Sequence, residues 1–366
     1  MIRRMNRSDI ALIRLASQHI GGTKFTSPKE VVTWMGAMQA QDYPLSKWAV
    51  GVRLPGSTDK DIETAIKNAD IIRTHLLRPT WHFVSADDIY WLLDLTGPQV
   101  ISSFGPRDRQ LGLTKETFSK SNAIIEKTLG GGKHLTREEL KAELKQVSIP
   151  TDQNRLSHIL GHAEADQIIC SGITRNGKHT YALLSERVPR KKRLVKEEAL
   201  ANLAKRYFTS RCPASLQDFT WWSGLPSRDA RQALELVKSE FRSEGFDGQM
   251  YWCPQDSSIA KSDEQSAFLL PTYDEFIISY TDRTASIPAK LEQYLKVISN
   301  RGVFWPIVVV NGQVVGIWKR TNKKDKLIVE LELFIKPSEL TIHLVEEEAN
   351  QMGNFLGKRA EVNNKS

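Results

Sequence analysis

The sequence predicts an α+β protein in which three tandem units, each made of three helices and a β-hairpin, precede a small β-barrel or sheet with a helix. Three observations support this fold class. Capping residues and the helical spacing of apolar residues define successive helices. Each group of helices is followed by two extended stretches joined by a turn. The end of the chain instead holds β-rich runs and one long helix. We therefore expect four units, at residues 1–104, 105–188, 189–260 and 261–362.

Capping residues define the helices of the first unit. Ser8 begins a helix that should run to Ile20, where two glycines follow. Ser27 precedes Pro28, and proline is favoured at the first position of a helix. The next elements are expected as helices at 46–52 and 58–69, strands at 71–76 and 80–84, and a helix at 89–95. Three helices followed by a hairpin form the winged-helix pattern.

The second unit carries the clearest local signals. Thr136 and Glu139 form a capping box, and Asn176-Gly177 is a strong signal for a hairpin turn. The third helix should enter the DNA groove, as in a helix-turn-helix. Its residues His158 and His162 are spaced by one helical turn, and we expect them to face DNA or solvent rather than a metal. The elements are expected as helices at 115–129, 136–147 and 153–166 and strands at 168–173 and 179–184.

The third unit repeats this order of elements, which indicates a tandem array. Its elements are expected as helices at 195–209, 215–222 and 227–240 and strands at 241–244 and 250–253.

The last unit has a different character. Asn311-Gly312 predicts a tight hairpin between two β-rich runs, and a helix should extend from Ser338 to about Leu356. Asp274 and Arg283 are expected to form a buried ion pair that holds the barrel. Residues 363–366 are expected to be disordered.

Charge and cysteine content restrict the class of protein. The chain carries a net charge of +8 and a pI of about 9.2, which favours a polyanionic partner. Three widely separated cysteines argue against a disulfide framework and for a reducing compartment. No apolar run is long enough to span a bilayer, and no signal peptide is recognisable. We therefore expect a cytoplasmic protein, associated with the nucleoid, without a membrane partner.

Basic residues at the hairpins, the linker and the third unit are the candidate contacts to DNA phosphates. Five of the eight residues 189–196 are basic, although a solvated hinge is the alternative for this linker. A packed side chain is the alternative for His82, which could face His75 across the first hairpin. The candidates are Arg78, His82, Arg175, Lys178, Arg190, Lys191, Lys192, Arg193, Arg228 and Arg231.

The segment Gln39-Ala40-Gln41-Asp42-Tyr43-Pro44 is the candidate catalytic motif. Each Gln amide offers one acceptor oxygen and two N–H donors, so the pair can hold a water or a base in a fixed orientation. Neither amide is a strong general base. The alternative is a helix terminus at which one amide caps the last carbonyls, and Asp42 could either assist catalysis or cap a turn.

Three stretches resemble the winged-helix family of AlkZ-like and YcaQ-like bacterial DNA glycosylases. They are residues 34–54, which contain the Gln-x-Gln motif, residues 73–84 and residues 269–283. The Gln-x-Gln form resembles the AlkZ-like branch rather than the Gln-x-Asp branch. The resemblance implies tandem winged helices and a C-terminal β-barrel wrapped around duplex DNA. It also implies monofunctional excision of N-alkylated bases, including unhooking of interstrand crosslinks.

The implied reaction suits neutral amides. An N-alkylated purine is cationic and therefore a good leaving group, so the enzyme mainly has to place a water at C1′. Gln39 and Gln41 are the candidates for this role, with Asp42 as a third member. We expect no cofactor, no metal, a monomeric state, and double-stranded DNA with alkylated bases as the partner. The main alternative is a DNA-binding protein without catalysis, such as a transcription regulator, and a second is a structural nucleoid or RNA-binding module.

Overall fold

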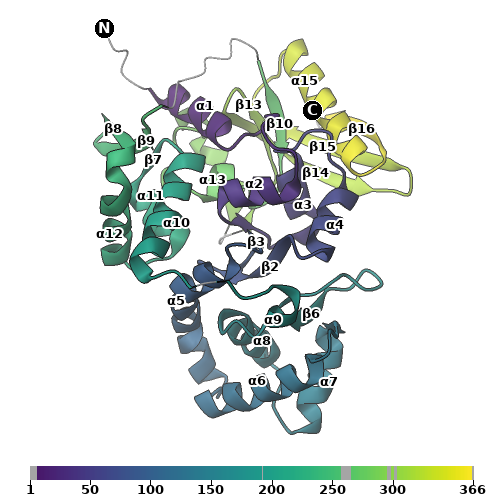
Figure 1. Cartoon of the computed structure of the whole chain (residues 1–366). Helices are drawn as coiled ribbons and strands as arrows, with labels where there is room; N and C mark the ends of the chain where they lie inside the picture. Colours follow the sequence, from purple (N-terminus) through teal and green to yellow (C-terminus); the bar gives the residue numbers. More distant parts are fainter. Residues whose placement is uncertain (1–5, 192, 257–264, 295–297, 301–302, 365–366) are drawn as a thin grey trace.

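The computed structural model describes residues 6–191, 193–256, 265–294, 298–300 and 303–364. The fold is a mixed α+β fold, in which three groups of helices with small sheets adjoin a larger C-terminal sheet. Figure 1 shows the second group at the bottom of the view, with α5 leading into it.

The helix α1 (Arg7–Ser17) precedes the first group and ends three residues before the expected Ile20. The reason is that His19 adopts a left-handed conformation (φ 51°), which turns the chain before the glycines are reached. The first group then consists of α2 (Pro28–Met35), β1 (Met38–Gln39), α3 (Tyr43–Gly51), α4 (Asp59–Lys67), β2 (Ile71–Leu76) and β3 (Thr80–Ser85).

Asp42 shifts the start of α3. Its carboxylate accepts a hydrogen bond from the Leu45 N–H, and Pro44 occupies the first turn of the helix. The helix therefore begins at Tyr43, not at Ser46 as expected. The two residues Met38 and Gln39 form a strand that pairs with β3, so the motif is not a simple turn.

The long helix α5 (Ile89–Gln110) corrects the expected helix at 89–95. It spans 22 residues, contains Pro98 and Pro106, and crosses the boundary expected at residues 104 and 105. A proline inside a helix removes one backbone hydrogen bond. The helix continues because its far end packs against α8 (Arg155–Ala165), where Asp108 bonds two histidines.

The second and third groups repeat the element order of the first. In each group a short strand lies beside the second strand of a hairpin, so the three sheets have the orders β1-β3-β2, β4-β6-β5 and β7-β9-β8. The second group contains α6 (Lys115–Leu129), β4 (Leu135–Thr136), α7 (Arg137–Gln146), α8, β5 (Ile169–Ser171), β6 (Thr180–Leu183) and α9 (Leu184–Arg187). The third group contains α10 (Lys196–Ser210), β7 (Ala214–Ser215), α11 (Leu216–Ser223), α12 (Ser227–Val237), β8 (Phe241–Phe246) and β9 (Gln249–Pro254).

The C-terminal part is an open sheet rather than a closed barrel. Its strands have the order β10-β13-β14-β15-β16, and no pairing joins β10 to β16 among the described residues. Asn363 and Asn364 belong to the last strand, which pairs with β15 in parallel, so these two residues of the tail expected to be disordered are ordered; residues 365 and 366 lie outside the described part. The elements are β10 (Ala267–Leu270), α13 (Glu275–Ile278), β13 (Ile307–Val310), β14 (Gln313–Asn322), β15 (Lys326–Leu333), α15 (Glu339–Phe355) and β16 (Arg359–Asn364).

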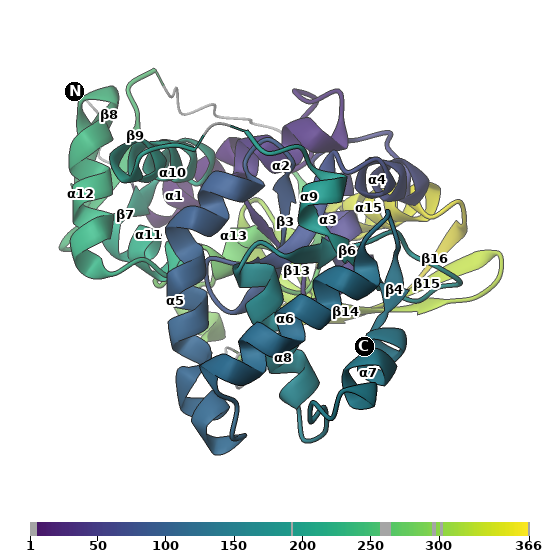
Figure 2. The same ribbon diagram turned by 60° about the horizontal axis from the view of Figure 1, so that its bottom comes forward.

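Two apolar cores place the Gln-containing strand at the centre of the molecule. One core joins the first group to the C-terminal sheet, and includes Trp48, whose indole N–H donates to the Leu269 carbonyl. The other joins the first group to α5 and to the third group. The chain joins the two cores at the start of β1, because Met38 belongs to the first core and Ala37, which precedes the strand, to the second. Figure 2 shows the first, third and C-terminal groups gathered around β3.

Candidate active site

Gln39 lies in a row of three polar side chains that crosses the first small sheet. It is paired with His82 on β3, which is in turn paired with Thr74 on β2. Residues directly opposite in antiparallel strands point to the same face of a sheet. The Gln39 side chain is 8% exposed, and His82 and Thr74 are fully buried. The row is therefore an enclosed polar strip.

The backbone of Gln39 is held by a buried ion pair. The Gln39 N–H donates to Glu275 at 2.9 Å, and the other carboxylate oxygen accepts from Arg211 at 2.8 Å, from Ser279 at 2.6 Å and from the Trp222 indole at 2.9 Å. Burial opposes ionisation of Glu275. The charge of Arg211 and the hydrogen bonds to the carboxylate outweigh it and lower the pKa of Glu275 to about 2.

Arg211 extends the same network to the turn before the strand. Its guanidinium donates to the carbonyls of Met35 at 2.7 Å and Ala37 at 2.9 Å. The third group and α13 thus fix both the position and the direction of β1, although they lie far from it in the sequence.

Arg78 contacts the Gln39 side chain directly. Its Nη2 lies 3.4 Å from Oε1 of Gln39, and its guanidinium lies over the ring of Trp221 with 5.2 Å to the centroid. Burial lowers the pKa of Arg78 from its ordinary value. Arg78 is one of the predicted DNA contacts, and its guanidinium is bonded to the candidate catalytic amide.

His82 is a neutral acceptor beside this amide. Its Nδ1 lies 2.9 Å from the Thr80 carbonyl, which can only accept, so Nδ1 carries the proton and Nε2 is the free acceptor. Burial, assisted by the charge of Arg78, lowers the pKa of His82 to about 3. Nε2 is buried without a hydrogen-bond partner among the described residues, and so is the Thr74 hydroxyl.

Two expectations for His82 are therefore corrected. Its side chain has no exposed surface, so it cannot contact a phosphate. It is also not opposite His75, which is paired with Trp81 and bonded to Glu164.

Gln41 and Asp42 lie at the exposed end of the motif. Gln41 is exposed and follows Gln39 by two residues, at a bend after the end of β1. Asp42 lines a hollow of about 610 Å³ together with Tyr273 and Arg320. Burial and the nearby Asp42 raise the pKa of Tyr273 above its ordinary value. The motif thus runs from a buried amide to an exposed amide and a partly exposed carboxylate.

The second group reaches the motif through its hairpin. The His179 ring lies 4.5 Å from the ring of Tyr43, whose hydroxyl donates to Glu63 at 2.8 Å. The strands that flank the Asn176-Gly177 turn therefore bring this hairpin to the first group. Arg175 on the hairpin is bonded to Glu139, whereas Lys178 is exposed.

The linker cations are exposed but lie along α5. Lys191 is 2.5 Å from Asp87, Arg193 is 3.4 Å from Asp94, and the Arg190 guanidinium lies 5.6 Å from the Tyr90 ring centroid. Lys192, also predicted to contact DNA, lies outside the described residues.

The third helix of the second group is not free to enter a DNA groove. Most of α8 from Ile159 to Ala165 is buried against α5 and β2. His158 and His162, expected to face DNA or solvent, both bond Asp108, at 2.6 and 2.9 Å. By contrast, Arg228 and Arg231 on α12 are exposed.

The buried carboxylates near the motif were not fully predicted from the sequence. Asp274 pairs with Arg53, at 2.9 Å to both guanidinium nitrogens, and not with Arg283, which donates to the Ile277 carbonyl. Glu275 was missed entirely. The only signal was its position in the stretch 269–283, where an acidic pair interrupts an apolar run. Among the described residues, no group of three or more His, Cys, Asp or Glu is arranged to hold a metal ion.

Comparison with known proteins identifies relatives across almost the whole chain. Residues 32–355 match the family described as "DNA glycosylase AlkZ-like". An interstrand DNA cross-link repair glycosylase from Streptomyces sahachiroi is 22% identical over 94% of this chain and 95% of that protein. The solved structure of Streptomyces sahachiroi DNA glycosylase AlkZ has a similar fold, with a TM-score of 0.83 and 19% identity over 99% of this chain and 100% of that one.

Proposed function

Because the chain belongs to the AlkZ-like family of DNA glycosylases, we propose that it hydrolyses the N-glycosidic bond of N-alkylated purines in double-stranded DNA. The relative from Streptomyces sahachiroi is named for interstrand cross-link repair, and we extend this substrate class to the present chain. The family supports a glycosylase over a DNA-binding protein without catalysis, the main alternative.

The observation that carries this proposal is the fixed amide of Gln39, two residues before the exposed amide of Gln41. Arg78 occupies one side of the Gln39 carbonyl oxygen, and Glu275 fixes the backbone. A side chain held in this way can orient a water without reorganisation during the reaction.

The chemistry requires little more from the protein. The oxygen of the water forms a bond to C1′, the bond from C1′ to the base nitrogen breaks, and its electron pair neutralises the cationic base. The water loses one proton to solvent. The Gln39 side chain can orient the water by hydrogen bonding, because Nε2 can donate a hydrogen bond and the second lone pair of Oε1 can accept one. Asp42 caps α3, and we assign it a positioning role in this motif.

The proposed mode of DNA binding is based on the three repeated groups. The three groups share one element order and one strand order, and we propose that they are winged helices that hold duplex DNA together as parts of one monomer. Helix α12 is the best candidate for a phosphate contact, because Arg228 and Arg231 are exposed on it. Binding to chromosomal DNA would place the protein in the nucleoid.

A base-release assay tests the proposed function. Duplex DNA with N7-methylguanine, and duplex DNA with a nitrogen-mustard crosslink, would be incubated with enzyme and treated with alkali to break abasic sites. Gln39→Ala and Gln41→Ala should each lower the single-turnover rate by on the order of a hundredfold, because each loses an oriented amide. Gln146→Ala, at an exposed glutamine on α7, is the matched control. Wild-type enzyme that binds but releases neither base would contradict the proposal.

A further inference from the structure

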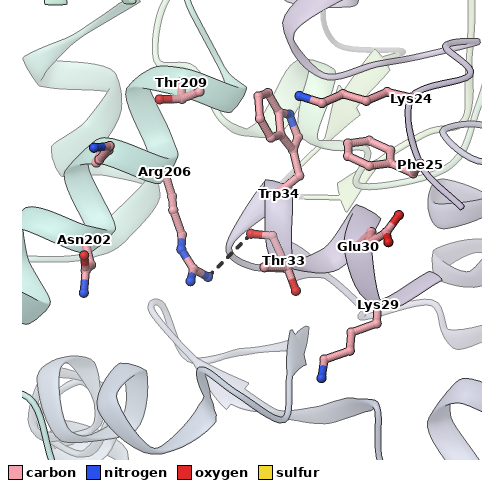
Figure 3. A pocket seen from close by; sticks show the side chains of 10 residues that line it. Lys24, Phe25, Lys29, Glu30, Thr33, Trp34, Asn202, Arg206 and Thr209 are labelled. Carbon is pink, nitrogen blue, oxygen red and sulfur yellow. Dashed lines mark hydrogen bonds between the residues drawn. The ribbon is translucent and has the colours of Figure 1, made fainter. Parts of the chain in front are cut away.

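A groove of about 630 Å³ lies between α2 and α10. It shares no lining residue with the hollow beside Asp42. Figure 3 shows its apolar wall, Phe25 and Trp34, opposite side chains of α10. A concave site of this size matches the usual range for small-molecule pockets, about 300–1,000 Å³.

The wall of the groove is a rigid aromatic cluster. The indole N–H of Trp34 donates to the Ser17 carbonyl at 2.9 Å, which fixes the ring. His19 packs edge-on against Phe25 and Trp34, each at 5.0 Å between centroids. Burial, with smaller contributions from neighbouring cations, lowers the pKa of His19 to about 4, so this wall is uncharged at neutral pH.

Lys24 places a cation against this wall. Its Nζ lies 3.5 Å from the centroid of the Trp34 ring, and burial lowers its pKa. In the part of the chain that the structure describes, no carboxylate lies within ion-pair distance of Lys24. The three other cations at the groove are already paired, Lys29 with Asp87, Lys205 with Glu240 and Arg206 with Asp88.

Three neutral polar side chains and one carboxylate complete the site; the carboxylate is that of Glu30, which accepts hydrogen bonds from the N–H and hydroxyl of Thr26. Thr33 on α2 and Asn202 and Thr209 on α10 line the groove, and their side chains offer both donors and acceptors. A few polar groups in an otherwise apolar pocket typically determine how a ligand is oriented.

We propose that this groove binds a small molecule made of a planar aromatic ring and one anionic group. The ring of the ligand lies against Trp34 and Phe25. Its anionic group pairs with Lys24, and this ion pair replaces the contact between Lys24 and the indole ring of Trp34. Aromatic carboxylates and nucleoside monophosphates share this chemistry. A DNA backbone does not fit it, because phosphate binding needs several unpaired cations rather than an aromatic wall.

Isothermal titration calorimetry with the full chain tests the proposal. Indole-3-acetate, or deoxyadenosine monophosphate if the source is a nucleotide, should bind at a ratio of one to one with a Kd of about 1 mM or tighter. Indole-3-acetamide lacks the charge and acetate lacks the ring, and each should bind at least about tenfold more weakly. Absence of saturation with both aromatic anions would overturn the proposal.

Two substitutions locate the site. Asn202→Trp, at an exposed position, should fill the groove and abolish binding, and Lys24→Gln should reduce the affinity for indole-3-acetate to that for the amide. Lys127→Gln, an exposed lysine of α6, is the control. Unchanged binding in either groove variant, or displacement of the ligand by undamaged duplex DNA, would contradict the proposal. Base release should be unchanged in both variants, so the two functions are tested separately.

Discussion

At the scale of single residues, the charge and the hydrogen bonding of the candidate site depend on the neighbours of each polar side chain. Gln39 and His82 are neutral at physiological pH, and Arg78 is the one cation bonded to the Gln39 side chain among the described residues. A fixed orientation preorganises the hydrogen bonds of an amide, and the free Nε2 of a neutral imidazole can accept a hydrogen bond. The sequence showed which groups are present, but not that Arg78 is directed inward.

Substitution of Arg78 distinguishes an orienting role from a phosphate contact. Arg78→Met keeps the aliphatic packing on Trp221 but removes the hydrogen bond to Gln39, and should lower the rate of base release about 10- to 100-fold, as expected for loss of one charge-assisted hydrogen bond. The salt dependence of DNA binding should not change.

Lys178→Gln is the counterpart, because it removes an exposed cation from the second hairpin and should change only binding. If Arg78→Met weakened DNA binding at low salt but preserved single-turnover release, Arg78 would be a phosphate contact after all.

At the scale of elements, helix α15 carries a buried acid. Glu348 faces the C-terminal sheet and is 3% exposed, and one of its carboxylate oxygens has no hydrogen-bond partner among the described residues. Burial raises the pKa of Glu348 to about 8, with a small opposing contribution from a backbone hydrogen bond at Leu269. The folded protein therefore holds this proton at pH values at which the unfolded chain, with an ordinary pKa near 4.5, releases it.

Glu348→Gln should remove a pH dependence of stability. In the wild-type protein the contribution of Glu348 is most favourable below about pH 4.5 and is lost as the pH rises to about 8, because only the unfolded state ionises in this range. The variant should therefore match the wild type near pH 5 and exceed it by a few kcal/mol at pH 8.5, given about 1.4 kcal/mol per pKa unit.

Urea unfolding at both pH values measures this difference. Glu346→Gln, at an exposed position of the same helix, is the control. A constant difference between Glu348→Gln and wild type at the two pH values would show that Glu348 does not titrate in this range.

At the scale of the whole molecule, long-range ion pairs hold the motif between three parts of the chain. Glu275 is separated from Gln39 by 236 residues and from Arg211 by 64. Removing one partner of such a buried pair leaves an uncompensated charge, which typically lowers the free energy of unfolding by about 3–5 kcal/mol.

None of the described helices is both long and apolar enough to cross a membrane.

The distribution of cations predicts where DNA lies. Arg228 and Arg231 on α12 are exposed, whereas Lys191 of the linker lies beside Asp87, just before α5, and Arg193 beside Asp94 in α5. Arg228→Gln with Arg231→Gln should reduce the slope of log Kobs against log salt by about 2, because each phosphate contact contributes about 0.9. Lys191→Gln with Arg193→Gln should reduce it less. Fluorescence anisotropy across a salt series measures both, and the reverse order would place DNA along the linker.

The sequence by itself determined the local elements. The caps at Ser27 and Thr136 and the Asn176-Gly177 turn depend only on neighbouring residues, so they could be located without a structure. The repeated order of helices and hairpins, and the stretches that resemble a glycosylase family, were visible for the same reason. The three tandem hairpins therefore lie close to the predicted positions.

Only the tertiary structure decided which partners these elements meet. Asp274 pairs with Arg53 instead of Arg283, Glu275 anchors Gln39, and α8 is buried instead of exposed. The physical reason is that ion pairing and burial depend on distances between residues far apart in the chain, which a linear pattern of charge and hydrophobicity does not contain.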